Sequence, residues 1–139
     1  MAGGFPPRYL IWRRCMTMSG DFNKRVCVCD EDEFISQALL RLFNKRGIAV
    51  SIASDENELW NVVSENSFDA IVFEPIHNGE CRSEIVRSFI SREFPVVIFT
   101  SANHPDDISA LVSHTPSAIF LKLHSSPARV VEHIYSLIQ

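Results

Sequence analysis

Five short runs rich in apolar and β-branched residues, spaced about one helix apart, constrain the fold of this chain more than any other feature. They are residues 25–29, 48–53, 69–73, 95–100 and 118–123. Their starts are separated by 23, 21, 26 and 23 residues, which leaves room for one helix in each interval and for no antiparallel hairpin. The sequence therefore predicts five consecutive βα units.

The segments between these runs carry the start and stop signals of helices. Asp32 can cap the first helix, and Gly47 follows its end at a position suited to left-handed backbone. Asp55 and Glu58 form an acidic version of the capping box at the start of the second helix. Proline stands in the first turn of the last two helices, at Pro105 and Pro127. These signals predict one helix after each run.

The central runs indicate how the layers are arranged. Residues 70–73 and 96–99 are apolar at every position, as strands are when helices cover both faces of a parallel sheet. Because crossover connections are right-handed, the predicted fold is α/β, a three-layer doubly wound sandwich around a five-stranded parallel sheet. Side chains that act in such folds gather at the carboxyl ends of the strands.

Composition limits the class of protein. A chain of 139 residues corresponds to one domain, and its net charge of −4 argues against binding to nucleic acid. No apolar run approaches the roughly 20 residues that cross a bilayer, and the 4 cysteines are too few for a disulfide framework. We therefore expect a soluble cytoplasmic domain at residues 24–139, preceded by an extended or disordered segment at residues 1–23.

Polar side chains follow four of the five predicted strands. Asp30, Glu31 and Asp32 follow the first strand, Glu74 the third and Thr100 the fourth, and the last strand carries Lys122. Carboxylates gathered at one sheet edge require a divalent cation, an ammonium group or raised pKa values. Hard oxygen ligands favour Mg²⁺, and an ammonium with a hydroxyl can neutralise a phosphoryl group. The set suits the chemistry of phosphoryl transfer.

These segments resemble the receiver domain of bacterial two-component response regulators, and the resemblance covers residues 24–139. The matching segments are VCVCDE at 26–31, FDAIVFE at 68–74, FPVVIFT at 94–100 and AIFLK at 118–122. The resemblance implies a flavodoxin-like sheet with strand order 2-1-3-4-5. It also implies a weak Mg²⁺ site at Asp30, Glu31 and Glu74, phosphate contacts from Thr100 and Lys122, and no organic cofactor.

The chain departs from the family pattern where phosphate would attach. Glu74 stands in place of the phosphoacceptor aspartate and is longer by one carbon–carbon bond, roughly 1.5 Å. A misplacement of about 1 Å can reduce a rate about 100-fold. The loop after Glu74 also lacks the Met-Pro of the family, Leu123 replaces a proline, and Ile119 replaces an aromatic switch residue. We therefore expect an atypical pseudo-receiver, not an enzyme, in which Glu74 reaches toward Thr100 and Lys122 and partly imitates the phosphorylated state.

The resemblance also implies partners. A pseudo-receiver would bind a signalling protein, either a histidine kinase or an output domain, and two copies could pair through the last two helices and the last strand. No motif for direct contact with nucleic acid and no membrane segment is visible. The sequence is consistent with a single-domain module or with the amino-terminal part of a longer regulator.

Two other functions use the same residues. In a phosphatase of the haloacid-dehalogenase type, Asp30 would be the nucleophile and Asp32 the acid/base, but no acidic pair follows Lys122 to hold Mg²⁺. In a flavodoxin-like cofactor carrier, the first βα turn would supply amides and hydroxyls for phosphate, and here it carries acids instead. Both alternatives stay open on the sequence alone.

Overall fold

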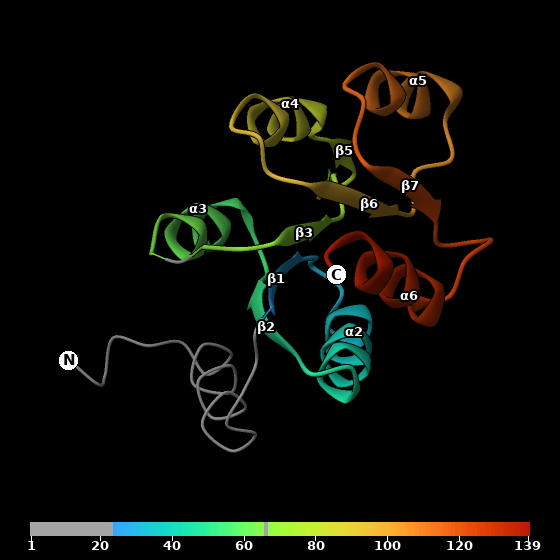
Figure 1. Ribbon diagram of the computed structural model, residues 1–139. Helices are drawn as coiled ribbons and strands as arrows, with labels where there is room; N and C mark the ends of the chain where they lie inside the picture. Colours follow the sequence, from blue (N-terminus) through green and yellow to red (C-terminus); the bar gives the residue numbers. More distant parts are fainter. Residues whose placement is uncertain (1–23, 66) are drawn as a thin grey trace.

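The computed structural model describes residues 24–65 and 67–139, and the predicted alternation of strands and helices is present throughout them (Figure 1). The elements are β1 (Lys24–Cys29), α2 (Glu33–Lys45), β2 (Ile48–Ala53), α3 (Glu56–Glu65), β3 (Ala70–Phe73), β4 (Ile76–His77), β5 (Glu80–Cys81), α4 (Ser83–Ser91), β6 (Val96–Thr100), α5 (Pro105–Ser113), β7 (Ala118–Leu121) and α6 (Pro127–Leu137). The segment at residues 1–23, predicted to be extended or disordered, lies outside the described residues.

The five long strands form one parallel sheet in the order β2-β1-β3-β6-β7. This order is the predicted 2-1-3-4-5 arrangement of the five runs. Helices α2 and α6 pack on one face, and α3, α4 and α5 on the other (Figure 1). The predicted three-layer, doubly wound α/β fold is confirmed. In the described part of the chain, no helix is long and apolar enough to span a bilayer.

Alternation along β1 divides the core between the two faces. Val26 and Val28 contact the cluster under α2 and α6, whereas Cys27 and Cys29 contact the cluster under α3, α4 and α5. Both thiols are free and fully buried. Burial raises the pKa of Cys27 to about 12 and raises that of Cys29 as well. The two cysteines are therefore small core residues.

Most of the predicted helix starts and stops are confirmed. The Asp32 carboxylate accepts the N–H of Phe34 at 2.9 Å, and that of Asp55 accepts the N–H of Glu58 at 2.9 Å. Gly47 has a φ of 74°, in the left-handed region that its position after α2 requires. The helices α5 and α6 begin at the two prolines of the sequence pattern, Pro105 and Pro127.

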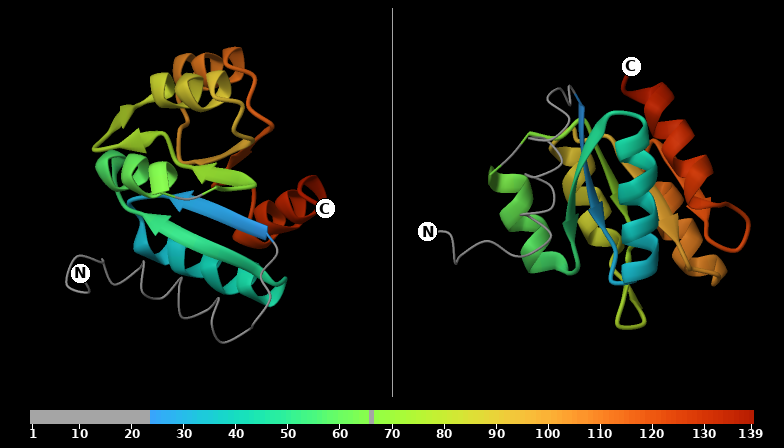
Figure 2. Two further views of the ribbon diagram at one scale, coloured as in Figure 1. Left: turned by 60° about the vertical axis from the view of Figure 1, so that its left-hand side comes forward. Right: turned by 90° about the horizontal axis from the view of Figure 1, so that it is seen from below.

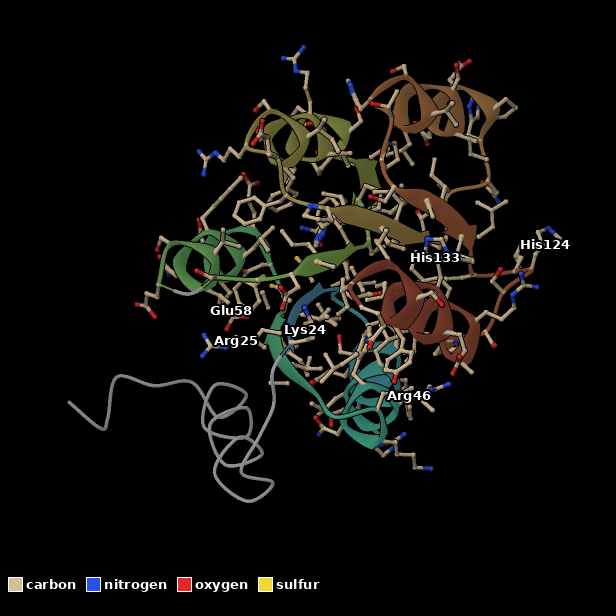
Figure 3. All side chains as sticks on the ribbon, viewed as in Figure 1. Lys24, Arg25, Arg46, Glu58, His124 and His133 are labelled. Carbon is tan, nitrogen blue, oxygen red and sulfur yellow. The ribbon has the colours of Figure 1, made fainter. Side chains whose placement is uncertain are left out.

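An ion pair connects the two helices on one face of the sheet. Arg46, labelled in Figure 3, directly follows α2, and its guanidinium binds the carboxylate of Glu132 on α6. The guanidinium also lies over the ring of Tyr135, with 4.5 Å between Cζ and the ring centroid. Since both partners of the ion pair are exposed, the stacking and the shared core fix the helices more than the charges do.

The expectation that no antiparallel hairpin interrupts the chain is wrong at one place. Between β3 and α4, strands β4 and β5 pair antiparallel through a two-residue turn. Asn78 and Gly79 form this turn with φ of 51° and 81°, the left-handed pair that a type I′ hairpin needs. The spacing of the runs leaves no room for another strand of sheet length, but two strands of two residues fit into the longest interval. Figure 2 shows the hairpin projecting from the body of the domain.

Candidate functional site

Backbone hydrogen bonds at the carboxyl edge of the sheet place the predicted site residues side by side. The Glu74 N–H donates to the Cys29 carbonyl at 3.0 Å, and the Lys122 N–H donates to the Thr100 carbonyl at 2.8 Å. These bonds continue the ladders between neighbouring strands for one residue past their ends. The side chains of Asp30, Glu74, Thr100 and Lys122 consequently meet above the sheet.

The Glu74 carboxylate is buried, with only 2% of the residue exposed, and each of its oxygens accepts from the protein. Oε2 accepts the Thr100 hydroxyl at 2.5 Å and the Ile76 N–H at 3.0 Å. Oε1 accepts the Ser101 N–H at 2.8 Å and the Ser101 hydroxyl at 3.1 Å, and lies 3.0 Å from the Lys122 ammonium. Such charge-assisted bonds are about twice as strong as neutral ones. Glu74 therefore points into the site and is held there.

Thr100 connects this carboxylate to the next loop. The residue is fully buried, and its Oγ1 donates to Glu74 while accepting the N–H of Ala102 at 3.0 Å. One hydroxyl proton can serve only one acceptor, so these two bonds fix the direction of the hydroxyl. The position of residues 100–102 therefore depends on the anion at Glu74.

Lys122 lies between two carboxylates. Its Nζ is 2.8 Å from Asp30 Oδ2 and 3.0 Å from Glu74 Oε1. Burial raises the pKa of Asp30, and the charge of Glu74 adds to the rise, against the opposing effect of Lys122. Burial by itself would lower the pKa of Lys122, but its hydrogen bonds and attraction to the two carboxylates raise it overall. The ammonium is therefore the internal cation of the site.

The third predicted metal ligand lies elsewhere. The Glu31 carboxylate accepts the backbone N–H of Asn78 at the hairpin tip, at 3.2 and 3.3 Å to its two oxygens. Asp30 is already engaged, since its Oδ1 accepts the Asp32 N–H at 2.8 Å. Across residues 24–65 and 67–139, no three His, Cys, Asp or Glu side chains are arranged to hold a metal ion. As they are placed, these carboxylates do not fit a Mg²⁺ site.

Two residues that bind Glu74 were not among the predicted site residues. Ser101 contributes both its N–H and its hydroxyl, and Ile76 contributes its N–H. Ser101 directly follows Thr100, so its place at the strand end was the available signal. The Ile76 amide lies two residues after Glu74, at the start of the hairpin that the sequence did not predict.

Several other polar residues lie apart from the site or have structural roles. The Asp69 carboxylate accepts the N–H of Arg25 at 2.8 Å, at the opposite edge of the sheet. Asp32 is the cap of α2, which leaves a phosphatase without its acid/base. His124 lies in the loop after β7, and His133 lies on α6 (Figure 3). Neither histidine contributes to the cluster of Glu74 and Lys122.

Comparison with known proteins identifies the fold. No protein-family model matches the sequence, and no curated protein sequence matches it. The structure is similar to a response regulator from Thermotoga maritima, with 19% identity, a TM-score of 0.70, and coverage of 83% of this chain and 97% of that one.

Two further solved structures agree. An orphan response regulator of H. pylori has 9% identity and a TM-score of 0.73, covering 85% of this chain and 98% of that one. A CheY-like receiver domain from Methanospirillum hungatei has 17% identity and a TM-score of 0.73, covering 83% of this chain and 93% of that one. The chain has the receiver-domain fold.

Proposed function

We propose that this receiver fold is an atypical signalling module of the two-component type, in which Glu74 takes the place of a phosphorylated aspartate. The observation that carries the proposal is the set of contacts around the Glu74 carboxylate. A bound phosphoryl group would need a hydroxyl, a backbone N–H and a cation for its oxygens. Glu74 accepts from Thr100, Ser101 and Lys122, which supply these three kinds of group.

The same contacts oppose phosphorylation of Glu74 itself. A carboxylate that attacks phosphorus must first release the donors that stabilise its charge. Here both oxygens are bound, and 2% exposure leaves no open approach for a phosphoryl donor. We infer that transfer to Glu74 is inefficient and that the module is not an enzyme.

We further infer that the module works without Mg²⁺. Lys122 supplies positive charge between Asp30 and Glu74, and Glu31 is used by the hairpin. Any Mg²⁺ would have to displace the ammonium or free Glu31, so binding is weak. The proposed module needs no organic cofactor.

The proposed action is binding to a signalling protein in the cytoplasm, either a histidine kinase or an output domain. Pairing of two copies through α5, β7 and α6 is a second part of this proposal. A groove of about 410 Å³ between β7 and α6, lined by Phe120, Ala128 and His133 among others, supports it. The exposed Ala128 offers a test, because Ala128→Glu would place a charge in the groove and lower the mass measured by light scattering. An unchanged mass would refute the pairing.

The main test is incubation of the whole chain with acetyl phosphate and Mg²⁺, followed by intact mass spectrometry. We expect no stoichiometric species heavier by about 80 Da, the mass of an added phosphoryl group. Glu74→Asp shortens the side chain and should permit phosphoryl transfer. Asp30→Asn is the matched control, because it removes an acid of the same site and leaves Glu74 in place. A stoichiometric adduct on the natural chain that disappears in Glu74→Gln would overturn the proposal.

A further inference from the structure

The hairpin β4–β5 connects two parts of the site. The Asn78 N–H donates to Glu31 in the β1–α2 loop, and the Ile76 N–H donates to Glu74. The ring of His77 stacks on Phe73, with 5.8 Å between ring centroids. Each strand of the hairpin has only two residues, and a hairpin of this size has little stability of its own. These external contacts therefore hold it closed.

The turn of this hairpin carries the one Asn-Gly pair of the chain. Asn78 and Gly79 are both exposed, and in the part of the chain that the structure describes the Gly79 N–H has no hydrogen-bond acceptor. A Cβ at Gly79 would meet nothing within 4 Å, so the turn is open to solvent. Beside it lies a cleft of about 270 Å³, lined by Asn78, His77, Asp55 and other polar residues.

We propose that Asn78 is a site of spontaneous deamidation, and that the product releases the hairpin from Glu31. The backbone nitrogen of Gly79 attacks Cγ of Asn78, and a carbon–nitrogen bond forms as the side-chain amide leaves as ammonia. Water then opens the cyclic imide at one of its two carbonyls, which gives aspartate or isoaspartate. Asparagine is a thermolabile residue, and a following glycine presents no side chain to hinder the attack.

The product weakens the contact that holds the hairpin. Aspartate places a carboxylate on the residue whose N–H binds Glu31, at 3.2 and 3.3 Å. Two carboxylates on residues in contact repel each other. Isoaspartate also lengthens the backbone by one carbon, which the two-residue turn cannot accommodate in its left-handed geometry. Both products therefore favour opening of the hairpin.

The rate is tested on the full chain, aged at neutral pH and body temperature, folded and in urea, with peptide mapping by mass spectrometry. Conversion adds about 1 Da to the peptide that contains Asn78. We expect the folded rate to lie within about tenfold of the unfolded rate, an opening free energy of about 1.4 kcal/mol or less. Asn103, exposed and followed by His104, is the internal control and should convert at least about tenfold more slowly. A folded rate more than about 100-fold below the unfolded one, or equal rates at Asn78 and Asn103, would overturn the assignment.

The consequence is tested by hydrogen exchange of the hairpin amides. Asn78→Asp imitates one product, and Asn78→Gly is the matched control, because a Gly-Gly turn keeps the type I′ geometry without charge. We expect exchange at residue 78 to be at least about tenfold faster in the aspartate variant than in the glycine variant. Equal exchange would show that the charge does not open the hairpin. Neither result depends on whether Glu74 imitates a phosphorylated aspartate.

Discussion

Replacing Glu74 by glutamine changes the charge of the site with almost no change in shape. The amide keeps one oxygen acceptor, and its NH₂ group faces donors wherever it is placed. With NH₂ at the Oε2 position, the Ile76 N–H and the Thr100 hydroxyl lose their acceptor. With NH₂ at the Oε1 position, the Ser101 groups and the Lys122 ammonium lose theirs. Either orientation leaves buried donors without a partner.

The expected loss follows from these contacts. Removing one partner of a buried ion pair costs about 3–5 kcal/mol, and hydrogen bonds to charged groups contribute about 1.5–3 kcal/mol each. Three effects make the loss smaller. The amide oxygen still accepts, Lys122 keeps its ion pair with Asp30, and the repulsion between Asp30 and Glu74 disappears. We therefore expect the Glu74→Gln variant to lose about 2–3 kcal/mol of its free energy of unfolding.

Urea denaturation followed by circular dichroism measures this loss. Glu31→Gln is the matched control, because it makes the same chemical change on an exposed side chain that accepts one backbone N–H. The control should lose no more than about 1 kcal/mol. If the two variants lose the same amount, or if Glu74→Gln loses less than about 0.5 kcal/mol, the Glu74 contacts do not stabilise the fold as argued.

Three other predictions concern the charge, the thiols and the backbone. Lys122→Met leaves two carboxylates facing each other, so its thermal midpoint should fall and should rise again with added Mg²⁺; a midpoint insensitive to Mg²⁺ would contradict the role of the ammonium. In the folded chain, Cys27 and Lys122 stay protonated at pH values above their ordinary pKa values of 9.0 and 10.5. The folded chain therefore binds more protons than the unfolded chain, and stability should decrease as pH rises above 9.0. Urea midpoints across this range check the sign, and replacing Cys27 and Cys29 by alanine should remove the part of the loss that begins near 9.0. Gly47→Ala meets no atom within 4 Å but retains a φ of 74°, so it should lose about 1 kcal/mol in the same assay; an unchanged midpoint would show that the turn relaxes freely.

The fold was predictable because one pattern determines most of it. Buried parallel strands must be apolar on both faces, and their spacing leaves room for one connection each. The same topology predicts that residues after the strands meet, which is why Asp30, Glu74, Thr100 and Lys122 could be selected from the sequence.

What the sequence did not predict depends on loop geometry. Glu31 binds the tip of the hairpin and leaves the site, because a two-residue turn at Asn78 brings an N–H within its reach. Ser101 enters the site because its N–H follows Thr100 around the strand end. Each contact is fixed by tertiary placement of a short segment, for which periodicity carries no signal.

The ion pair between Lys122 and Asp30 joins residues 92 positions apart, and this separation affects how the domain forms during synthesis. Asp30 and Glu74 leave the ribosome long before β7, and in a nascent chain they lack their counter-ion. Non-local contacts of this kind form late because closing a long loop is entropically unfavourable. We therefore expect stalled nascent chains ending before residue 118 to be readily cut by protease, and emergence of β7 with Lys122 to confer resistance in a single step; resistance that develops gradually would indicate that the earlier strands fold without the ammonium.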